Sequence, residues 1–288
     1  MKSRDLFLVA VFALTFAACN NDEMDQIFVP EEGEIQLKFI YPGAETRATD
    51  TNFEDADQIG VYVTAADAAL QIGGNVVNNE KFVFNGTSWS SARRVYWSNG
   101  QHNLYAYYPY SQIVNDIENY AFEVKPDQSS AANYTASDFL WAGKQDVAAS
   151  ASPVTMQFAH KLSNVVVKLE KGENYTGDIS LNTEVFIHST VAKAVIDLST
   201  GDAAKNDYAG TGSVKCLQKS ASEYVACVVP QNITTRRPLV EVITGGVSYL
   251  MEGKISLKPG MRHTITVTLD KNPEQTKIDI GGDIGGWN

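Results

Sequence analysis

The chain has 288 residues, with 23 lysines and arginines against 34 aspartates and glutamates, so its formal net charge is −11. Hydrophobic residues make up 44% and charged residues 20%, a composition typical of a folded soluble protein and too polar for one with many membrane spans. The negative charge and the lack of a long basic cluster exclude a nucleic-acid-binding protein. The length suffices for two domains of ordinary size or for one large domain.

Residues 1–18 have the pattern of an export signal. Lys2 and Arg4 precede an apolar run that is too short to cross a bilayer. Small residues then lead to Cys19, and a polar stretch follows at once, which resembles the lipobox of bacterial lipoproteins, although Phe16 stands where that box prefers leucine. The resemblance implies that Cys19 becomes the lipidated first residue of the mature chain and anchors it to a membrane. An ordinary secretory signal with a chance cysteine is the alternative.

A strand follows the acidic, non-periodic tether that begins at residue 20. Large side chains alternate with polar ones in this strand, so that four of them share one face: Ile35, Leu37, Phe39 and Tyr41. Burying these four would stabilise the fold by about 6 to 10 kcal/mol. Removing the strand would therefore open an apolar groove beside unpaired backbone groups, a state that invites another chain's strand.

The loop after this strand carries an isolated arginine. Pro42 and Gly43 end the strand, and the small polar residues around Arg47 predict an exposed loop, which is where proteases cut. Arg47 is followed by Ala48 rather than by proline, so the peptide bond between them is the expected cleavage site. We treat residues 19–47 as a tether plus a removable first strand.

The rest of the chain predicts an all-β fold. Segments with alternating hydrophobicity, rich in Val, Ile, Thr, Tyr and Phe, are separated by turn residues. Many short strands with frequent turns indicate antiparallel β-sandwiches. We also expect short helical turns within residues 55–71 and 118–123. The expected strands cover residues 35–41, 81–86, 103–110, 154–170, 223–230, 239–244 and 262–270.

A run of small residues with a proline at 143–155 predicts a domain boundary, which gives sandwiches over residues 48–150 and 151–288. The chain ends in a glycine-rich tail whose Ile278, Ile280 and Ile284 are in phase on one face. Because glycine weakens strands, this tail is a poor free-standing element, yet it could serve as a donor strand.

The search for chemistry finds no catalytic or metal site. The four histidines, at positions 102, 160, 188 and 263, lack metal-ligand spacing to one another or to the cysteines. The serine of the "GTGSV" segment at 210–214 lacks the strand–turn–helix context of a hydrolase nucleophile. The acidic residues at 50–58 lack the glycine and terminal glutamate of a calcium loop. We expect no cofactor and no enzyme activity.

Two features leave alternatives open. If residues 220–223 form a four-residue hairpin loop, Cys216 and Cys227 lie opposite one another and could form a disulfide, since export permits one; otherwise both are small buried hydrophobic residues. The aromatic side chains around Tyr107, with Trp97 nearby, either form a sugar-stacking platform or belong to the core.

The order of several segments resembles the fimbrillin family, the Mfa-like subunits of type V pili in the Bacteroidales. These are the lipobox at Cys19, the alternating strand, "TRA" around Arg47, "FEDADQIGVYV", "WSSARRVYW", "LYAYYPY", "SDFLWA" and "MQFAHKLSNVVVKLE". The resemblance implies two tandem transthyretin-like β-sandwich domains. It also implies export as a lipoprotein and cleavage after an arginine by a trypsin-like surface protease. By position, Arg47 matches the cleaved residue, and residues 34–41 match the strand that is expelled.

The function we expect is therefore a structural pilus subunit. An outer-membrane lipoprotein would be cut and then joined to other pilin subunits in a cell-surface fimbrium by strand insertion. The chain could be a stalk, tip or accessory subunit. The alternative is an uncut surface lipoprotein that binds a glycan or a host protein.

Overall fold

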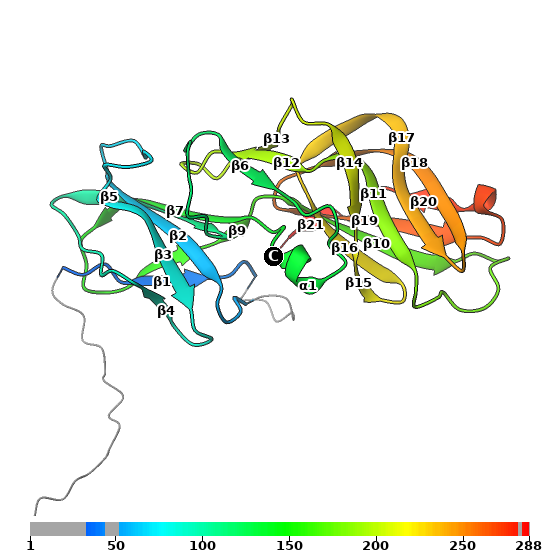
Figure 1. Cartoon of the computed structure of the whole chain (residues 1–288), viewed down its shortest axis with the longest axis horizontal. Coiled ribbons are helices and arrows are strands. Elements are labelled where there is room, and N and C mark those ends of the chain that lie inside the picture. Colours follow the sequence, from blue (N-terminus) through cyan, green and yellow to red (C-terminus); the bar gives the residue numbers. More distant parts are fainter. Residues whose placement is uncertain (1–32, 44–51, 282–283, 288) are drawn as a thin grey trace, which may run out of the picture. The chain divides into compact units, whose positions relative to one another are not determined.

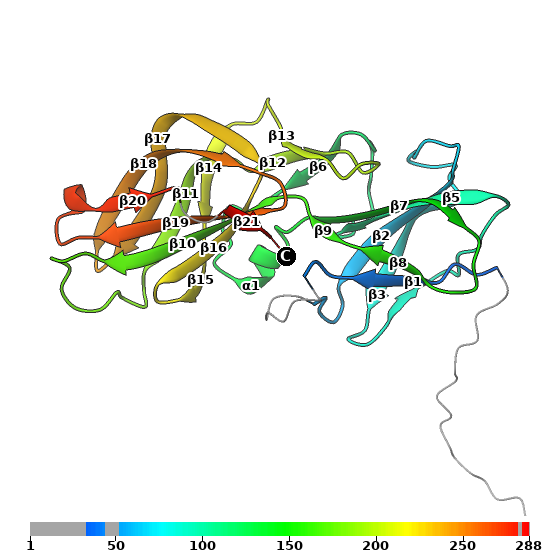
Figure 2. The same cartoon turned by 180° about the vertical axis from the view of Figure 1, so that it is seen from behind.

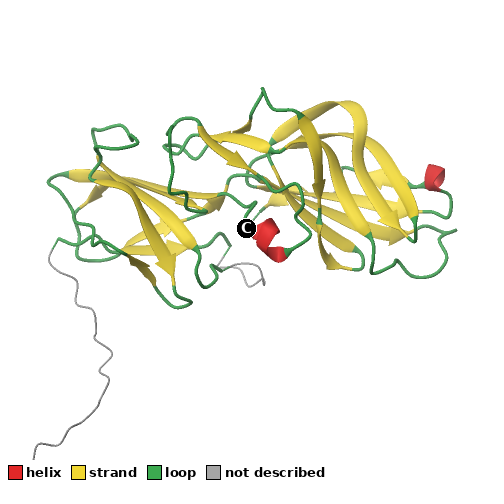
Figure 3. Ribbon diagram, in the orientation of Figure 1, coloured by secondary structure: helices red, strands yellow, loops and turns green. Residues whose placement is uncertain are grey.

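The computed structural model describes residues 33–43, 52–281 and 284–287. Strands dominate these residues, and the helical elements are the five-residue α1 (Ala131–Thr135) and the short 3-10 turn η1 (Pro273–Gln275) (Figure 3). Among these residues, no helix has both the length and the apolar character needed to cross a membrane. The all-β class expected from the alternating segments is confirmed.

The first sheet has six strands in the order β4-β3-β2-β5-β7-β9. All its pairs are antiparallel. Its strands are β2 (Gln58–Ala65), β3 (Val77–Phe84), β4 (Trp89–Ser91), β5 (Gln101–Tyr108), β7 (Leu140–Ala148) and β9 (Ala159–His160). The central strands β2 and β5 are buried along nearly their whole length, because both faces of this sheet are covered.

One face of the six-stranded sheet is covered by a second, small sheet. It consists of β1 (Leu37–Ile40) and β8 (Val154–Gln157), which pair in parallel and lie side by side in Figure 2. Apolar side chains from both sheets fill the space between them, including Ile59, Leu104 and Phe158.

Strands later in the chain form two further sheets. One has the order β15-β16-β10-β19-β20, with β21 also paired to β19, and the other has the order β14-β11-β17-β18 (Figure 1). The first comprises β10 (Ser163–Lys171), β15 (Leu217–Ser220), β16 (Glu223–Val228), β19 (Met261–Leu269), β20 (Lys277–Asp279) and β21 (Ile284–Gly286). The second comprises β11 (Glu184–Val191), β14 (Thr211–Lys215), β17 (Gln231–Thr244) and β18 (Val247–Leu257). Most of the buried valines, leucines and isoleucines of both sheets belong to one continuous core.

A three-stranded sheet has the order β13-β12-β6. It joins β6 (Tyr120–Glu123) to β12 (Lys193–Ile196) and β13 (Ala203–Lys205). Tyr120 and Phe139 pack with Tyr107 of β5, so aromatic rings cover the second face of the first sheet. Ser130 caps α1 by accepting a hydrogen bond from the Asn133 amide.

Both expected helical turns are wrong, since residues 58–65 and 120–123 are the strands β2 and β6. Strand β2 is buried on both faces and so lacks the clean alternation of a half-buried strand, which leaves a short apolar run ambiguous. Strand β6 pairs with β12, far along the chain, so no local turn signal marks it. The expected strand over residues 154–170 is three strands, β8, β9 and β10.

Strands on both sides of residue 150 pair with one another. Residues 143–148 continue β7, and β8 and β9 still pair with β1 and β7. Strand β6, in contrast, pairs with β12. The division into domains over residues 48–150 and 151–288, and their likeness to transthyretin, stay predictions.

Candidate functional site

The N-terminal segment, residues 33–41, is hydrogen-bonded to residues 95–97 on one flank at its start and to β8 on the other flank further along. Towards β8, the amides of Val154 and Phe158 donate to the carbonyl oxygens of Gln36 and Ile40 at 2.8 and 3.0 Å. On the other flank, the Ile35 amide donates to Val95 O, and the Trp97 amide donates to Gly33 O, both at 2.8 Å.

Backbone groups of successive residues in a strand point to opposite sides, so these two sets of bonds lie on opposite flanks. The backbone groups of Leu37 and Phe39 therefore point to a flank on which no strand of the described chain pairs with β1. The segment is an edge strand for most of its length.

The apolar face of this segment packs into the space between the two sheets. Ile35 and Phe39 are 4% and 8% exposed, and Leu37 and Tyr41 are partly buried against the same cluster. The exposed Lys38 points the other way. Burial of the large side chains is the main favourable term that holds the segment.

Phe39 lies among three aromatic rings. Its ring centroid is 5.5 Å from that of Phe82, 5.2 Å from that of Trp89 and 6.0 Å from that of Phe158. The contacts with Phe82 and Trp89 are edge-to-face, the geometry that aromatic pairs favour. Taking the segment away would expose this pocket and the inner face of β8.

Glu34 is the exception on the polar face of the segment. It is 8% exposed, and its Oε2 atom makes no hydrogen bond in the described structure. A buried carboxylate oxygen without a partner costs free energy.

The segment ends at Tyr41, beside a buried histidine–aspartate pair. Tyr41 donates from its hydroxyl to Asp138 Oδ2 at 3.4 Å, and His160 Nδ1 lies 2.9 Å from Asp138 Oδ1. The Tyr41 ring also makes edge contacts with Phe53 at 5.1 Å and His160 at 5.8 Å. Burial, and then the nearby Asp138 carboxylate, raise the pKa of the Tyr41 hydroxyl far above its ordinary value.

The C-terminal tail lies along β19. Strands β20 and β21 both pair antiparallel with β19. Ile278 and Ile280 pack against the core, but Ile284 is 52% exposed, so only two of the three isoleucines expected on one face are covered. The register shifts by two residues between the two ladders, since Asp279 lies opposite Thr266 and Ile284 lies opposite His263.

Trp287 is 7% exposed and stacks on His160 with ring centroids 3.8 Å apart and planes 6° from parallel. Sequence reasoning did not single out this residue. The signal was a lone large aromatic residue after a run of glycines.

Three of the predicted site residues, Cys19, Arg47 and Ala48, lie outside the described residues.

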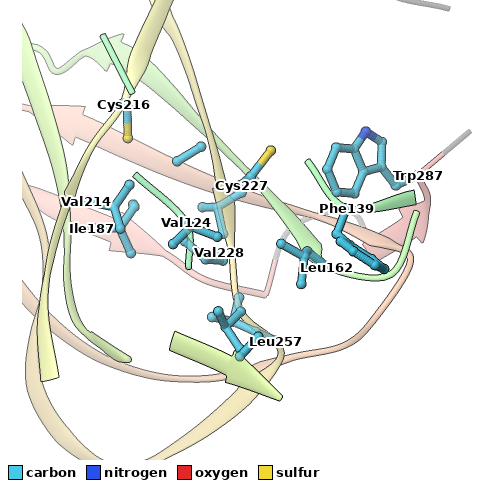
Figure 4. Packing of buried hydrophobic residues seen from close by; sticks show 14 of the residues in the cluster. Val124, Phe139, Leu162, Ile187, Val214, Cys216, Cys227, Val228, Leu257 and Trp287 are labelled. Carbon is cyan, nitrogen blue, oxygen red and sulfur yellow. The ribbon is translucent and has the colours of Figure 1, made fainter. Parts of the chain in front are cut away.

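Cys216, between β14 and β15, and Cys227 of β16 are free and buried in this structure, the second of the two alternatives left open by the sequence. The Cys216 amide donates to Val185 O of β11 at 2.8 Å, whereas Cys227 pairs with Asn164 of β10, so the two residues are bonded to different sheets. The two sulfur atoms consequently point into different parts of the core (Figure 4).

The "GTGSV" segment forms most of β14 and belongs to a polar row across the four-stranded sheet. His188 Nδ1 lies 2.7 Å from Ser213 Oγ, and His188 Nε2 lies 3.0 Å from Glu241 Oε2. Ser248 donates to Glu241 Oε1 at 2.6 Å. A shallow pocket of 320 Å³ opens beside this row. The row could not be found from the sequence, because its residues come from four different strands. The row satisfies the polar groups on this face and ties the four strands together.

Among the acidic residues at 52–58, the side chain of Asp57 is bonded to the protein, while Glu54 and Asp55 are exposed. Asp57 accepts hydrogen bonds from the Glu54 amide at 2.7 Å and from the Tyr108 hydroxyl at 3.0 Å. Burial raises the pKa of Asp57. No group of three or more His, Cys, Asp or Glu side chains in the described parts of the chain is arranged to hold a metal ion.

The aromatic strands contribute mainly to the core. Tyr107 is 1% exposed and donates to Asn79 Oδ1 at 2.8 Å, so its ring has no free face for a sugar. Trp97 is half-buried, packs against the cluster beneath β1 and donates to Ser150 O at 3.1 Å.

Comparison with known proteins places the chain in a family. The family model described as fimbrillin-like matches residues 46–287. A protein described as the fimbrium tip subunit Fim1C of Bacteroides ovatus is 27% identical over 192 residues, which cover 58% of this chain but only 35% of that relative. A protein described as the fimbrium subunit Fim1C of Bacteroides uniformis is 22% identical over 303 aligned positions, covering 100% of this chain and 96% of the relative.

Among solved structures, a cell adhesion protein from Bacteroides ovatus superposes with a TM-score of 0.71 at 20% identity, covering 90% of this chain and 98% of that one. At this level of identity the superposition supports the fold. The match of the family model over most of the sequence shows that the chain belongs to the fimbrillin-like family.

Proposed function

We propose that this chain is a non-enzymatic structural subunit of a type V pilus, exported as a lipoprotein through Cys19 and carried to the cell surface. Cleavage after Arg47 frees the segment that includes β1, and the vacated groove accepts a strand from a neighbouring subunit. Family membership supports the role as a fimbrial subunit.

The observation that carries the mechanism is the bonding of the N-terminal segment. It is held mainly by side-chain burial at Ile35, Phe39 and Tyr41, and within the described residues β1 pairs with a strand on one flank only. Such a strand can leave without disturbing a ladder on its open side, and the seat it leaves can accept any strand with large side chains at the same spacing.

The donor in this proposal is a C-terminal tail. In this chain the isoleucines at 278, 280 and 284 are the candidate donor residues, and two of them already pack against the fold when the tail is paired with β19.

Digestion of the purified, unlipidated chain with a trypsin-like protease tests the proposal. We expect a single early cut after Arg47, identified by the new N-terminus that begins at Ala48, followed by oligomers in size-exclusion chromatography. Arg47→Gln should abolish both the cut and the oligomers.

Arg236→Gln is the matched control. Arg236 has an exposed side chain paired with the exposed Glu252, an ion pair that contributes little to stability, so this variant should be cut and should assemble like the parent. Early cutting elsewhere, or a cut chain that stays monomeric, would contradict the proposal.

A further inference from the structure

The two ends of the described chain meet on one buried pair of side chains, His160 and Asp138, which we call the His160 seat. Tyr41 lies at the end of the N-terminal segment and Trp287 at the end of the tail, and both rings contact His160. Nothing in the spacing of the sequence indicates this meeting.

Trp287 anchors the last part of the tail. Its ring stacks on His160, and its amide donates to Gly260 O at 2.9 Å. Ile284 and the two glycines of β21 are exposed, so Trp287 supplies the buried side chain of residues 284–287. Trp287 belongs to the same core cluster as Phe139 and Leu162, which are both fully buried (Figure 4). Without its seat, this part of the tail keeps only a short ladder to β19.

Tyr41 closes the seat from the N-terminal side. His160 and Asp138 have side chains only 3% and 6% exposed, and Asp138 is shared between His160 Nδ1 and the Tyr41 hydroxyl. Loss of Tyr41 removes a hydrogen-bond donor from the carboxylate and an aromatic edge from the imidazole. It also lets water reach a pair that is otherwise dry, and hydration weakens the interactions inside it.

We propose that the His160 seat couples the N-terminal segment to the C-terminal tail, so that loss of the segment loosens Trp287 and releases the tail. This inference rests on the proposed function, in which a cut after Arg47 removes Tyr41. One cleavage then produces both the open groove and the free tail, while the uncut chain keeps both closed. The coupling is reciprocal by linkage: whatever frees Trp287 weakens the hold on Tyr41 by the same factor.

Hydrogen exchange measured by mass spectrometry on the full chain tests the coupling in both directions. Tyr41→Ala should make amide exchange in residues 284–287 about fivefold to tenfold faster, the change expected from loss of one good aromatic contact. Trp287→Ala should speed exchange at the Phe158 amide, which bonds Ile40 O, by a similar factor.

Phe39→Ala is the matched control, because Phe39 belongs to the same segment but its ring contacts Phe82, Trp89 and Phe158 rather than the seat. It should speed exchange along β8 more than in the tail. Tyr41→Phe, which keeps the ring and loses the hydroxyl, should give a smaller effect on the tail than Tyr41→Ala.

The outcomes separate the coupling from the proposed function. Unchanged tail exchange in Tyr41→Ala, or equal acceleration by Phe39→Ala, overturns the coupling even if the cut chain assembles. Faster tail exchange in Tyr41→Ala supports the coupling even if the protease never cuts after Arg47. The absence of that cut would contradict the proposed function and not the coupling.

Discussion

The packing of Phe39 sets how strongly the N-terminal segment is held, and Phe39→Ala measures it. The side chain is 8% exposed and has aromatic neighbours from β3, β4 and the residue after β8. Truncating a buried phenylalanine costs about 3 to 5 kcal/mol. We place this site near the lower end, about 3 kcal/mol, because an edge segment can shift inward and fill part of the void.

Urea unfolding of the uncut chain, followed by circular dichroism and by tryptophan fluorescence, gives this value. Lys38→Ala is the control, since Lys38 is exposed on the opposite face of the strand and its loss should change the free energy of unfolding by less than about 0.5 kcal/mol. A Phe39→Ala variant as stable as the parent would refute the reasoning, because the segment would then contribute nothing that its removal could expose.

Two further predictions concern buried titratable groups. His263 is 2% exposed and accepts a hydrogen bond from the Lys258 amide, and burial lowers the pKa of its imidazole below the ordinary 6.5. The folded protein therefore keeps His263 neutral where the unfolded chain protonates, so stability should fall as pH drops below about 6.5, and His263→Gln should flatten that part of a pH series of thermal unfolding midpoints. Burial raises the pKa of the thiols of Cys216 and Cys227, so a Cys19→Ser chain should react with a thiol reagent at pH 8 only after denaturation; rapid labelling of the native chain would contradict the buried placement.

Strands that alternate cleanly could be read from the sequence because one face is buried and the other wet. The segment over residues 35–41 and the strand β19 are of this kind, and the structure has strands there. The signal failed where both faces are covered, as in β2, or where the partner is distant, as in β6. Period alone does not separate a short buried strand from a buried helical turn.

The strand that pairs with the N-terminal segment could not be predicted either, because it is distant along the chain. The side-chain pattern of residues 35–41 shows which face is buried, but pairing in parallel with β8 depends on the whole chain in between. The sequence therefore indicates that the strand packs into an apolar groove. It does not indicate that β8 forms one wall of this groove, or that residues 95–97 bond the first residues of the segment.

The His160 seat shows the same limit at the level of single residues. A histidine in an alternating strand and a tryptophan after glycines carry no mutual signal, because their contact requires the tail to return along β19. The sequence likewise contains no sign that Cys216 bonds to β11 while Cys227 bonds to β10, because both partners are distant along the chain.

Reciprocal coupling has a consequence for assembly that neither end of the chain would have alone. Consider a subunit whose N-terminal segment has been cut but is still bound. Under the proposed coupling, capture of its tail by a neighbour's groove would move Trp287 away from His160 and weaken the contacts that hold Tyr41 by the same free energy. A fragment already cut but still bound by burial at Ile35 and Phe39 would then dissociate faster, which opens the groove on the subunit that has just joined. Under the proposed mechanism, capture of one subunit would therefore favour the opening of its own groove, and growth would proceed in one direction from an occupied end.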